Sequence, residues 1–134
     1  MSTPSETTSG AVNAPVSAVE QRLAELGLSL PEVAAPVAAY VPAVITGSHV
    51  YTSGQLPFIN GKLEATGKVS SGTEGTSDEP TVSPEDAKAY AAVCAINALA
   101  AIKSVIGDLD RITRIVKVVG FVSSDPAFTG QPGV

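Results

Sequence analysis

The clearest cluster of polar residues with the spacing of a binding site is Thr52-Ser53-Gly54-Gln55, which follows a short apolar run. A serine followed by a glycine at the end of a strand can present a hydroxyl and an unshielded backbone N–H to a ligand. The same residue types also suit an ordinary turn. The cluster is therefore a candidate site whose chemistry its residues do not define.

The chain contains few residues that could form another kind of catalytic site or a metal site. The single cysteine, Cys94, permits no disulfide within the chain and no cysteine-based zinc site, and we expect a buried structural thiol. The single histidine, His49, excludes a multi-histidine metal site and leaves a Ser-His-Asp triad one candidate base. His49 stands beside a predicted turn, so we expect an exposed ring with no catalytic role. We expect no metal and no cofactor.

The composition is that of one acidic, apolar-rich domain. The chain has 134 residues, with Lys plus Arg 8 and Asp plus Glu 13, a formal net charge of -5, and 44% hydrophobic residues. This is enough apolar material for a core, and the acidic balance argues against a nucleic-acid surface. We find no apolar run near the length of a membrane span and no signal peptide, so we expect a cytoplasmic protein without a membrane partner.

The N-terminal third predicts a helix and an extended approach to the first strand. Residues 1–16 are rich in Ser, Thr and Pro and predict a disordered leader, with the folded domain over residues 17–134. Ser17 and Glu20 have the spacing of a capping box, which predicts a helix from Ala18 to Leu26. The prolines between Pro31 and Pro42 predict an extended segment.

The middle of the chain predicts hairpins and a loop. Two β-rich runs flank Thr46-Gly47-Ser48 and predict a hairpin over residues 43–55, with His49 and Tyr51 on one face. Asn60-Gly61 predicts a second turn. The small, polar and acidic segment 69–82 predicts a flexible surface loop.

The last part predicts a long helix followed by a strand. Ser83 and Pro84 give a clear helix start, and Gly107 gives its end. An apolar stripe on this helix comprises Ala87, Ala91, Cys94, Ala98, Ile102 and Val105. Residues 111–123 are apolar on both faces, which predicts a central strand covered on both sides. The order strand, strand, helix, strand predicts an α+β sandwich, one sheet packed against helices.

Three spaced blocks resemble the RidA/YjgF family, between about Ala35 and Phe128. The first is Tyr40 followed by Val50-Tyr51-Thr52-Ser53-Gly54-Gln55-Leu56-Pro57, similar to the family's tyrosine and (I/V)xxSGQ(I/L)P strand. The second is the Ala-rich helix from Pro84, which ends in Gly-Asp-Leu-Asp. The third is the strand within residues 112–122, with the step Asp125 to Phe128 after it.

The resemblance implies a chorismate-mutase-like α+β fold, a homotrimer, and ligand clefts between neighbouring subunits. It implies hydrolysis of small enamines or imines to 2-oxo acids and ammonia, on a small-molecule carboxylate substrate. In such a site an Arg holds the carboxylate, hydroxyl and backbone N–H groups orient it, and a Glu positions the water. The longer leader suggests a divergent branch.

Carried over by position, Tyr40 matches the cleft tyrosine, and Ser53 and Gly54 match the cleft floor. The family's Arg and Glu lie in later motifs that these 134 residues do not contain, and Arg111 and Arg114 do not replace them. We therefore expect a chain that lacks the C-terminal third of the fold, is unstable as a lone monomer, and needs a homotrimer or a second chain to complete its sheet.

Two alternatives to the hydrolase stay open. One is a non-catalytic small-ligand-binding or structural module on the same fold, because the Arg and Glu have no counterpart. The other is an endoribonuclease, a label that some family members carry. The net charge of -5 and the scattered cations argue against nucleic acid as a partner.

Overall fold

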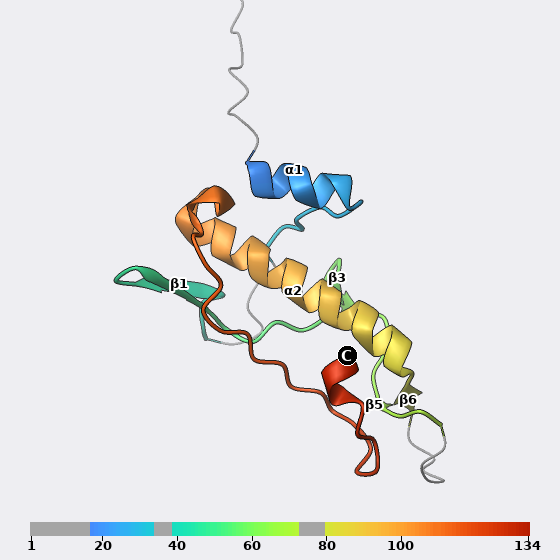
Figure 1. Ribbon diagram of the computed structural model, residues 1–134. Coiled ribbons are helices and arrows are strands. Elements are labelled where there is room, and N and C mark those ends of the chain that lie inside the picture. Colours follow the sequence, from blue (N-terminus) through green and yellow to red (C-terminus); the bar gives the residue numbers. More distant parts are fainter. Residues whose placement is uncertain (1–16, 34–38, 73–79) are drawn as a thin grey trace, which may run out of the picture.

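The computed structural model describes residues 17–33, 39–72 and 80–134 (Figure 1). The predicted leader, residues 1–16, lies outside them. The elements in chain order are α1 (Ala18–Glu25), β1 (Ala43–Thr46), β2 (His49–Thr52), β3 (Phe58–Ile59), β4 (Lys62–Leu63), β5 (Lys68–Val69), β6 (Thr81–Val82), α2 (Pro84–Ile106), η1 (Leu109–Arg111) and η2 (Gln131–Gly133). The mixture of helices with short sheets confirms the predicted α+β class.

Helix α1 begins where the sequence predicts, but its cap involves a distant residue. The Ser17 hydroxyl accepts a hydrogen bond from the backbone N–H of Glu20, which is one half of a capping box. The Glu20 carboxylate instead binds Lys103 of α2, at 2.5 Å. A second carboxylate, from Asp110 in η1, accepts hydrogen bonds from Ala18 N and Val19 N. The start of α1 is therefore tied to both α2 and η1.

Helix α2 is the longest element, and α1, the hairpin strands and the C-terminal segment are arranged around it (Figure 1). Ser83 caps its start, accepting a hydrogen bond from Asp86 N, and Gly107 ends it with a φ of 82°. By length and composition alone α2 could cross a membrane, which corrects the expectation that no segment approaches that length. One such helix is weak evidence, and α2 contacts β1, β2, β3 and η1 in this chain.

Two hairpins confirm the turn predictions. Strands β1 and β2 pair antiparallel, with Thr46 opposite His49 across the Gly47-Ser48 turn. The rings of His49 and Tyr51 lie on one face, with centroids 6.3 Å apart. Strands β3 and β4 pair across Asn60 and Gly61, whose φ values of 51° and 75° fit the two left-handed positions of a type I′ turn.

The predicted loop 69–82 is too long at both ends. Val69 and Val82 are buried partners in the parallel pair β5–β6, so neither belongs to a surface loop. Residues 73–79 of the predicted loop lie outside the described residues. Gly67 lies where the chain enters this pair. Its φ is 146°, and a Cβ atom there would come 2.2 Å from the Pro80 carbonyl oxygen. Only glycine allows the two segments to approach this closely.

The predicted central strand, residues 111–123, is wrong as a description of this chain. Residues 112–123 form no strand, and residues 113–121 are exposed on both faces, with Val118 at 83% and Phe121 at 95%, whereas Ile112 and Val122 are half-buried. A strand needs neighbours to bond, and in the described part of the chain the run has backbone partners only at its two ends. Ile112 N donates to Leu109 O at 3.0 Å, and Val69 N donates to Ser123 O at 2.8 Å.

Every residue of the predicted stripe on α2 is buried or half-buried, and the most deeply buried side chains gather at the two ends of the helix. Near its start, Ala87 packs with Val69, Val82 and Phe128. Near its end, Ala100 and Ala101 are buried, as are Leu23 of α1 and Leu109 of η1. Between these ends Cys94 is half-buried, which corrects the expected fully buried thiol.

Candidate functional site

The predicted site residues Ser53 and Gly54 directly follow β2, at the open end of the β1–β2 hairpin. The backbone N–H of Ser53 donates to Pro42 O at 2.9 Å, and its hydroxyl donates to the same oxygen at 3.3 Å. Pro42 directly precedes β1. Two hydrogen bonds therefore hold Ser53 beside the segment that enters the hairpin.

Tyr40 lies on that entering segment, two residues before Pro42. Its side chain is 44% exposed, so its ring and hydroxyl are available to a ligand or to a neighbouring chain. The bonds of Ser53 to Pro42 bring the backbones of the Tyr40 and Ser53 segments together. That the two hydroxyls line one cleft stays a prediction.

Gly54 has no structural need to be glycine among the described residues. It is exposed, its φ is not positive, and a Cβ atom would meet nothing within 4 Å. The missing side chain instead leaves the adjacent backbone open to a ligand or another chain. This is the property that the sequence analysis assigned to the Ser53-Gly54 pair.

Two further side chains hold this region: Gln55, from the predicted cluster, and Asn97, which the sequence analysis did not select. The Gln55 side-chain amide donates to the carbonyl oxygen and to the hydroxyl of Ser53, both at 3.3 Å. The Asn97 amide, from the middle of α2, donates to Leu56 O at 2.9 Å and to Phe58 O at 3.2 Å. A lone Asn in the apolar middle of α2 is the sequence signal that could have found the second contact.

His49 and Cys94 lack the surroundings of catalytic groups. His49 is exposed on β2, and its ring contact is with Tyr51. Burial raises the pKa of the Cys94 thiol, an effect partly opposed by a backbone hydrogen bond, so Cys94 is held as the thiol rather than the nucleophilic thiolate. In residues 17–33, 39–72 and 80–134, no three His, Cys, Asp or Glu side chains come together as a metal site.

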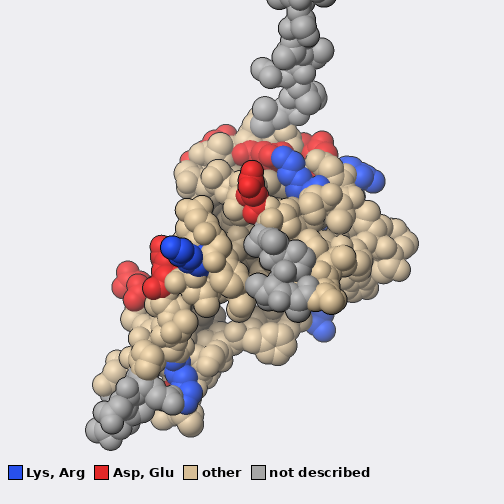
Figure 2. Space-filling model, turned by 180° about the vertical axis from the view of Figure 1, so that it is seen from behind, with Lys and Arg blue, Asp and Glu red and all other residues tan. Residues whose placement is uncertain are grey.

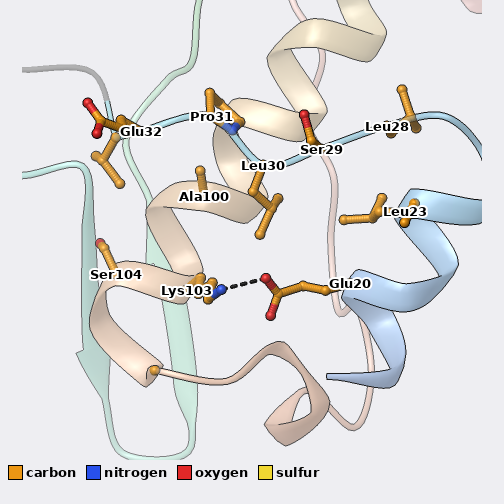
Figure 3. Close-up of a pocket in the computed structure, with 13 residues that line it drawn as sticks. Glu20, Leu23, Leu28, Ser29, Leu30, Pro31, Glu32, Ala100, Lys103 and Ser104 are labelled. Carbon is orange, nitrogen blue, oxygen red and sulfur yellow. Dashed lines mark hydrogen bonds and ion pairs between the residues drawn. The ribbon is translucent and has the colours of Figure 1, made fainter. Parts of the chain in front are cut away.

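A hollow of about 610 Å³ lies elsewhere, between α1, the segment 28–33 and the end of α2 (Figure 3). Leucine side chains line much of it, and the Lys103–Glu20 ion pair crosses it. None of the predicted site residues contributes to its lining. Among the described residues of the candidate site, Tyr40 and Gly54 are exposed and Ser53 is half-buried.

Comparison with known proteins decides the family. A family model described as "YjgF/chorismate mutase-like, putative endoribonuclease" matches residues 20–132. The chain belongs to this family. The blocks around Ser53-Gly54, α2 and residues 112–128 all lie inside the match.

Solved structures agree with this membership. The chain is 34% identical to a "putative endoribonuclease" from Shewanella oneidensis MR-1, with a TM-score of 0.72 over 85% of this chain and 70% of that one. It is 43% identical to the protein Atu1372, of unknown function, from Agrobacterium tumefaciens, with a TM-score of 0.70 over 86% of this chain and 65% of that one. The fold is therefore the chorismate-mutase-like α+β fold of the YjgF family, as the resemblance implied.

A curated relative shows the same family relationship. Protein TCP17 from Trypanosoma cruzi is 37% identical over 113 residues, which cover 84% of this chain and 65% of that protein. The chain thus spans less than two thirds of the length of this YjgF-family relative.

Proposed function

We propose that the chain is part of a hydrolase of small imines and enamines, which converts 2-iminopropanoate or 2-iminobutanoate to the 2-oxo acid and ammonia. The supporting observation is the Ser53-Gly54 pair, which its bonds to Pro42 hold beside the Tyr40 segment in a YjgF-family chain. These are the residues to which the family resemblance assigns substrate binding.

The proposed chemistry is addition of water to a carbon–nitrogen double bond. Water attacks the imine carbon, the carbinolamine loses ammonia, and a carbonyl remains. The Ser53 hydroxyl and the Gly54 N–H would orient the substrate carboxylate, and the Tyr40 hydroxyl would close the other side. The Arg that binds the carboxylate and the Glu that positions the water would come from outside these 134 residues.

The proposal also requires that this chain assemble with other chains. The side chains of residues 115–121 carry Ile, Val and Phe into solvent, with Phe121 at 95% exposure. Unpaired strand edges and exposed apolar patches of this kind are covered in stable proteins. We propose that a homotrimer, or a second polypeptide that completes the sheet, covers this run and encloses the site.

The decisive experiment measures ammonia release from 2-aminoacrylate generated in situ. The chain is assayed alone and together with a polypeptide that carries the C-terminal part of a longer relative. Acceleration in the combined sample, and weak or no acceleration by the chain alone, is the expected result. No acceleration in either sample contradicts the proposed activity. Sequencing of the DNA beyond codon 134 shows whether an arginine motif follows.

A second candidate function is endoribonuclease activity, favoured by the names of the family model and of the Shewanella relative. The charge of the chain is unfavourable for binding RNA. The net charge is -5, and on the face in Figure 2 the Lys and Arg side chains are scattered rather than gathered into a patch. RNA cleavage that persists after removal of contaminating nucleases would support it. Calorimetric binding of 2-oxo acids without turnover would instead support a non-catalytic binding module.

A further inference from the structure

We propose that Asn97 is a positioning residue for the candidate site, and that it fixes the segment 55–58 by which the chain leaves Ser53 and Gly54. This inference rests on the proposed function for its effect on activity. It rests on the contacts of Asn97 alone for its effect on the backbone.

The Asn97 side chain binds two carbonyl groups of one short segment. Its Nδ2 atom donates to Leu56 O at 2.9 Å and to Phe58 O at 3.2 Å. An amide nitrogen has two N–H bonds, so one side chain can satisfy both carbonyls at once. Between them, Phe58 N donates to Leu56 O at 2.8 Å, which closes a tight turn around Pro57. Asn97 thus clamps both sides of this turn to α2.

The position of Asn97 in α2 indicates that its contact with the segment 55–58 explains why this position holds an asparagine. The positions from Ala89 to Ile102 are otherwise apolar, apart from the partly buried Tyr90. Asparagine is a poorer helix former than alanine or leucine, which dominate this stretch. A helix that needed only packing would be more stable with an apolar residue there. The acceptors lie 41 and 39 positions away, so Asn97 serves the segment rather than its own helix.

The clamp reaches the candidate site through one intervening residue. Gln55 directly precedes Leu56, and its side chain donates to the hydroxyl and carbonyl oxygens of Ser53. Fixing Leu56 O restrains the backbone that carries Gln55 and, through Gln55, the Ser53 hydroxyl. Loss of the Asn97 amide should therefore loosen the groups proposed to bind the substrate. Weaker ground-state binding raises KM and leaves kcat nearly unchanged.

Two substitutions separate positioning from folding. Asn97→Ala removes the donor, and Asn97→Asp keeps the shape but turns carboxylate oxygens toward the two carbonyls. When protonated, that carboxyl can donate one hydrogen bond, so the Asn97→Asp defect should shrink as the pH falls. Ser104→Ala is the matched control, because the Ser104 hydroxyl donates to Ala101 O within α2 itself.

The experiment combines hydrogen exchange with kinetics in the active assembly. We expect both Asn97 variants to raise KM for 2-iminopropanoate about tenfold, with kcat within about threefold. We expect faster amide exchange at Ser53 and Phe58, whose N–H groups donate to Pro42 O and Leu56 O, than in Ser104→Ala. Exchange at these amides equal to that of Ser104→Ala overturns the proposal, as does a fall in kcat with KM unchanged. If the wild-type protein shows no turnover, the proposed function fails, and the exchange comparison alone then decides whether Asn97 holds the segment.

Discussion

The hydroxyl of Ser17 donates to Oδ1 of Asp110 at 2.8 Å, although 93 positions separate the two residues in the chain. The same carboxylate accepts the backbone N–H groups of Ala18 and Val19, so a single side chain satisfies three donors at the start of α1. These bonds lower the pKa of Asp110, with the Val19 N–H as the largest cause, while desolvation acts weakly in the opposite direction.

This cap predicts acid-sensitive anchoring of α1. A carboxyl whose pKa is lowered by folding stabilises the folded state fully above its unfolded pKa of about 4, and loses that contribution as the pH falls through its folded pKa. Asp110→Asn should therefore lower the melting temperature at neutral pH and make little difference in strong acid. Melting curves from pH 7 to pH 2 measure this. Glu64→Gln, which removes an exposed carboxylate, is the control and should show no such trend.

Gly67 should not tolerate a side chain. Gly67→Ala places a Cβ atom against the Pro80 carbonyl and strains a φ of 146°, so we expect a loss of about 1–3 kcal/mol in the free energy of unfolding. Gly133→Ala is the matched control, because a Cβ atom there meets nothing within 4 Å. Urea unfolding of both variants compares them. Equal stability would show that the β5–β6 approach is looser than described.

Tyr40 and Ser53 should both contribute to activity if the proposed function holds. Tyr40→Phe and Ser53→Ala each remove one hydroxyl, and we expect kcat/KM to fall about tenfold for each. Tyr51→Phe and Ser48→Ala remove hydroxyls elsewhere on the same hairpin and serve as controls. A fall of the same size in the controls would mean that the hairpin, rather than the site, is responsible.

His49 should be dispensable. Its ring is exposed, and a positioned general base is worth about 10²–10⁴-fold in rate. We therefore expect His49→Ala to keep the rate of imine hydrolysis within about threefold of the wild type, across the pH range of activity. A hundredfold loss would assign His49 a role in proton transfer.

The exposed run 112–123 predicts that the 134-residue chain is unstable as a lone monomer. The apolar side chains exposed along this run contribute no burial to folding, and the net stability of a domain is only about 5–15 kcal/mol. Native mass spectrometry and sedimentation should find a trimer or a complex with a second polypeptide. Phe121→Asp should weaken that assembly, whereas Lys88→Ala on the surface of α2 should not. A sharp melting transition from an isolated single chain contradicts this prediction.

Local signals predicted the local structure well. Ser17 and Ser83 mark helix starts, Gly107 marks a helix end, and Asn60-Gly61 marks a turn, because each conformation depends on residues near in sequence. The parallel pairing of Val69 with Val82 escaped prediction, since two-residue strands carry no periodic pattern.

The site was predictable only in part, for a related reason. Tyr40 came from a family resemblance, and Ser53 and Gly54 came from a local polar cluster and from the same resemblance. The support from Asn97, in contrast, depends on which segments fold together. The sequence of residues 112–123 predicts a buried strand because apolar side chains occupy both of its faces. Its neighbours, however, are not supplied by the described residues, and its apolar character could not show this.

The placement of buried side chains at the two ends of α2 has a thermodynamic consequence. The cluster of Val69, Val82, Ala87 and Phe128 is far along the helix from Ala100, Ala101 and Leu109. The two groups share the helix itself as a rigid connection, so they unfold cooperatively only while its central turns stay intact. In the assembled protein, a helix-breaking residue midway, such as Ala95→Pro, should divide one melting transition into two and leave each end to melt at its own temperature.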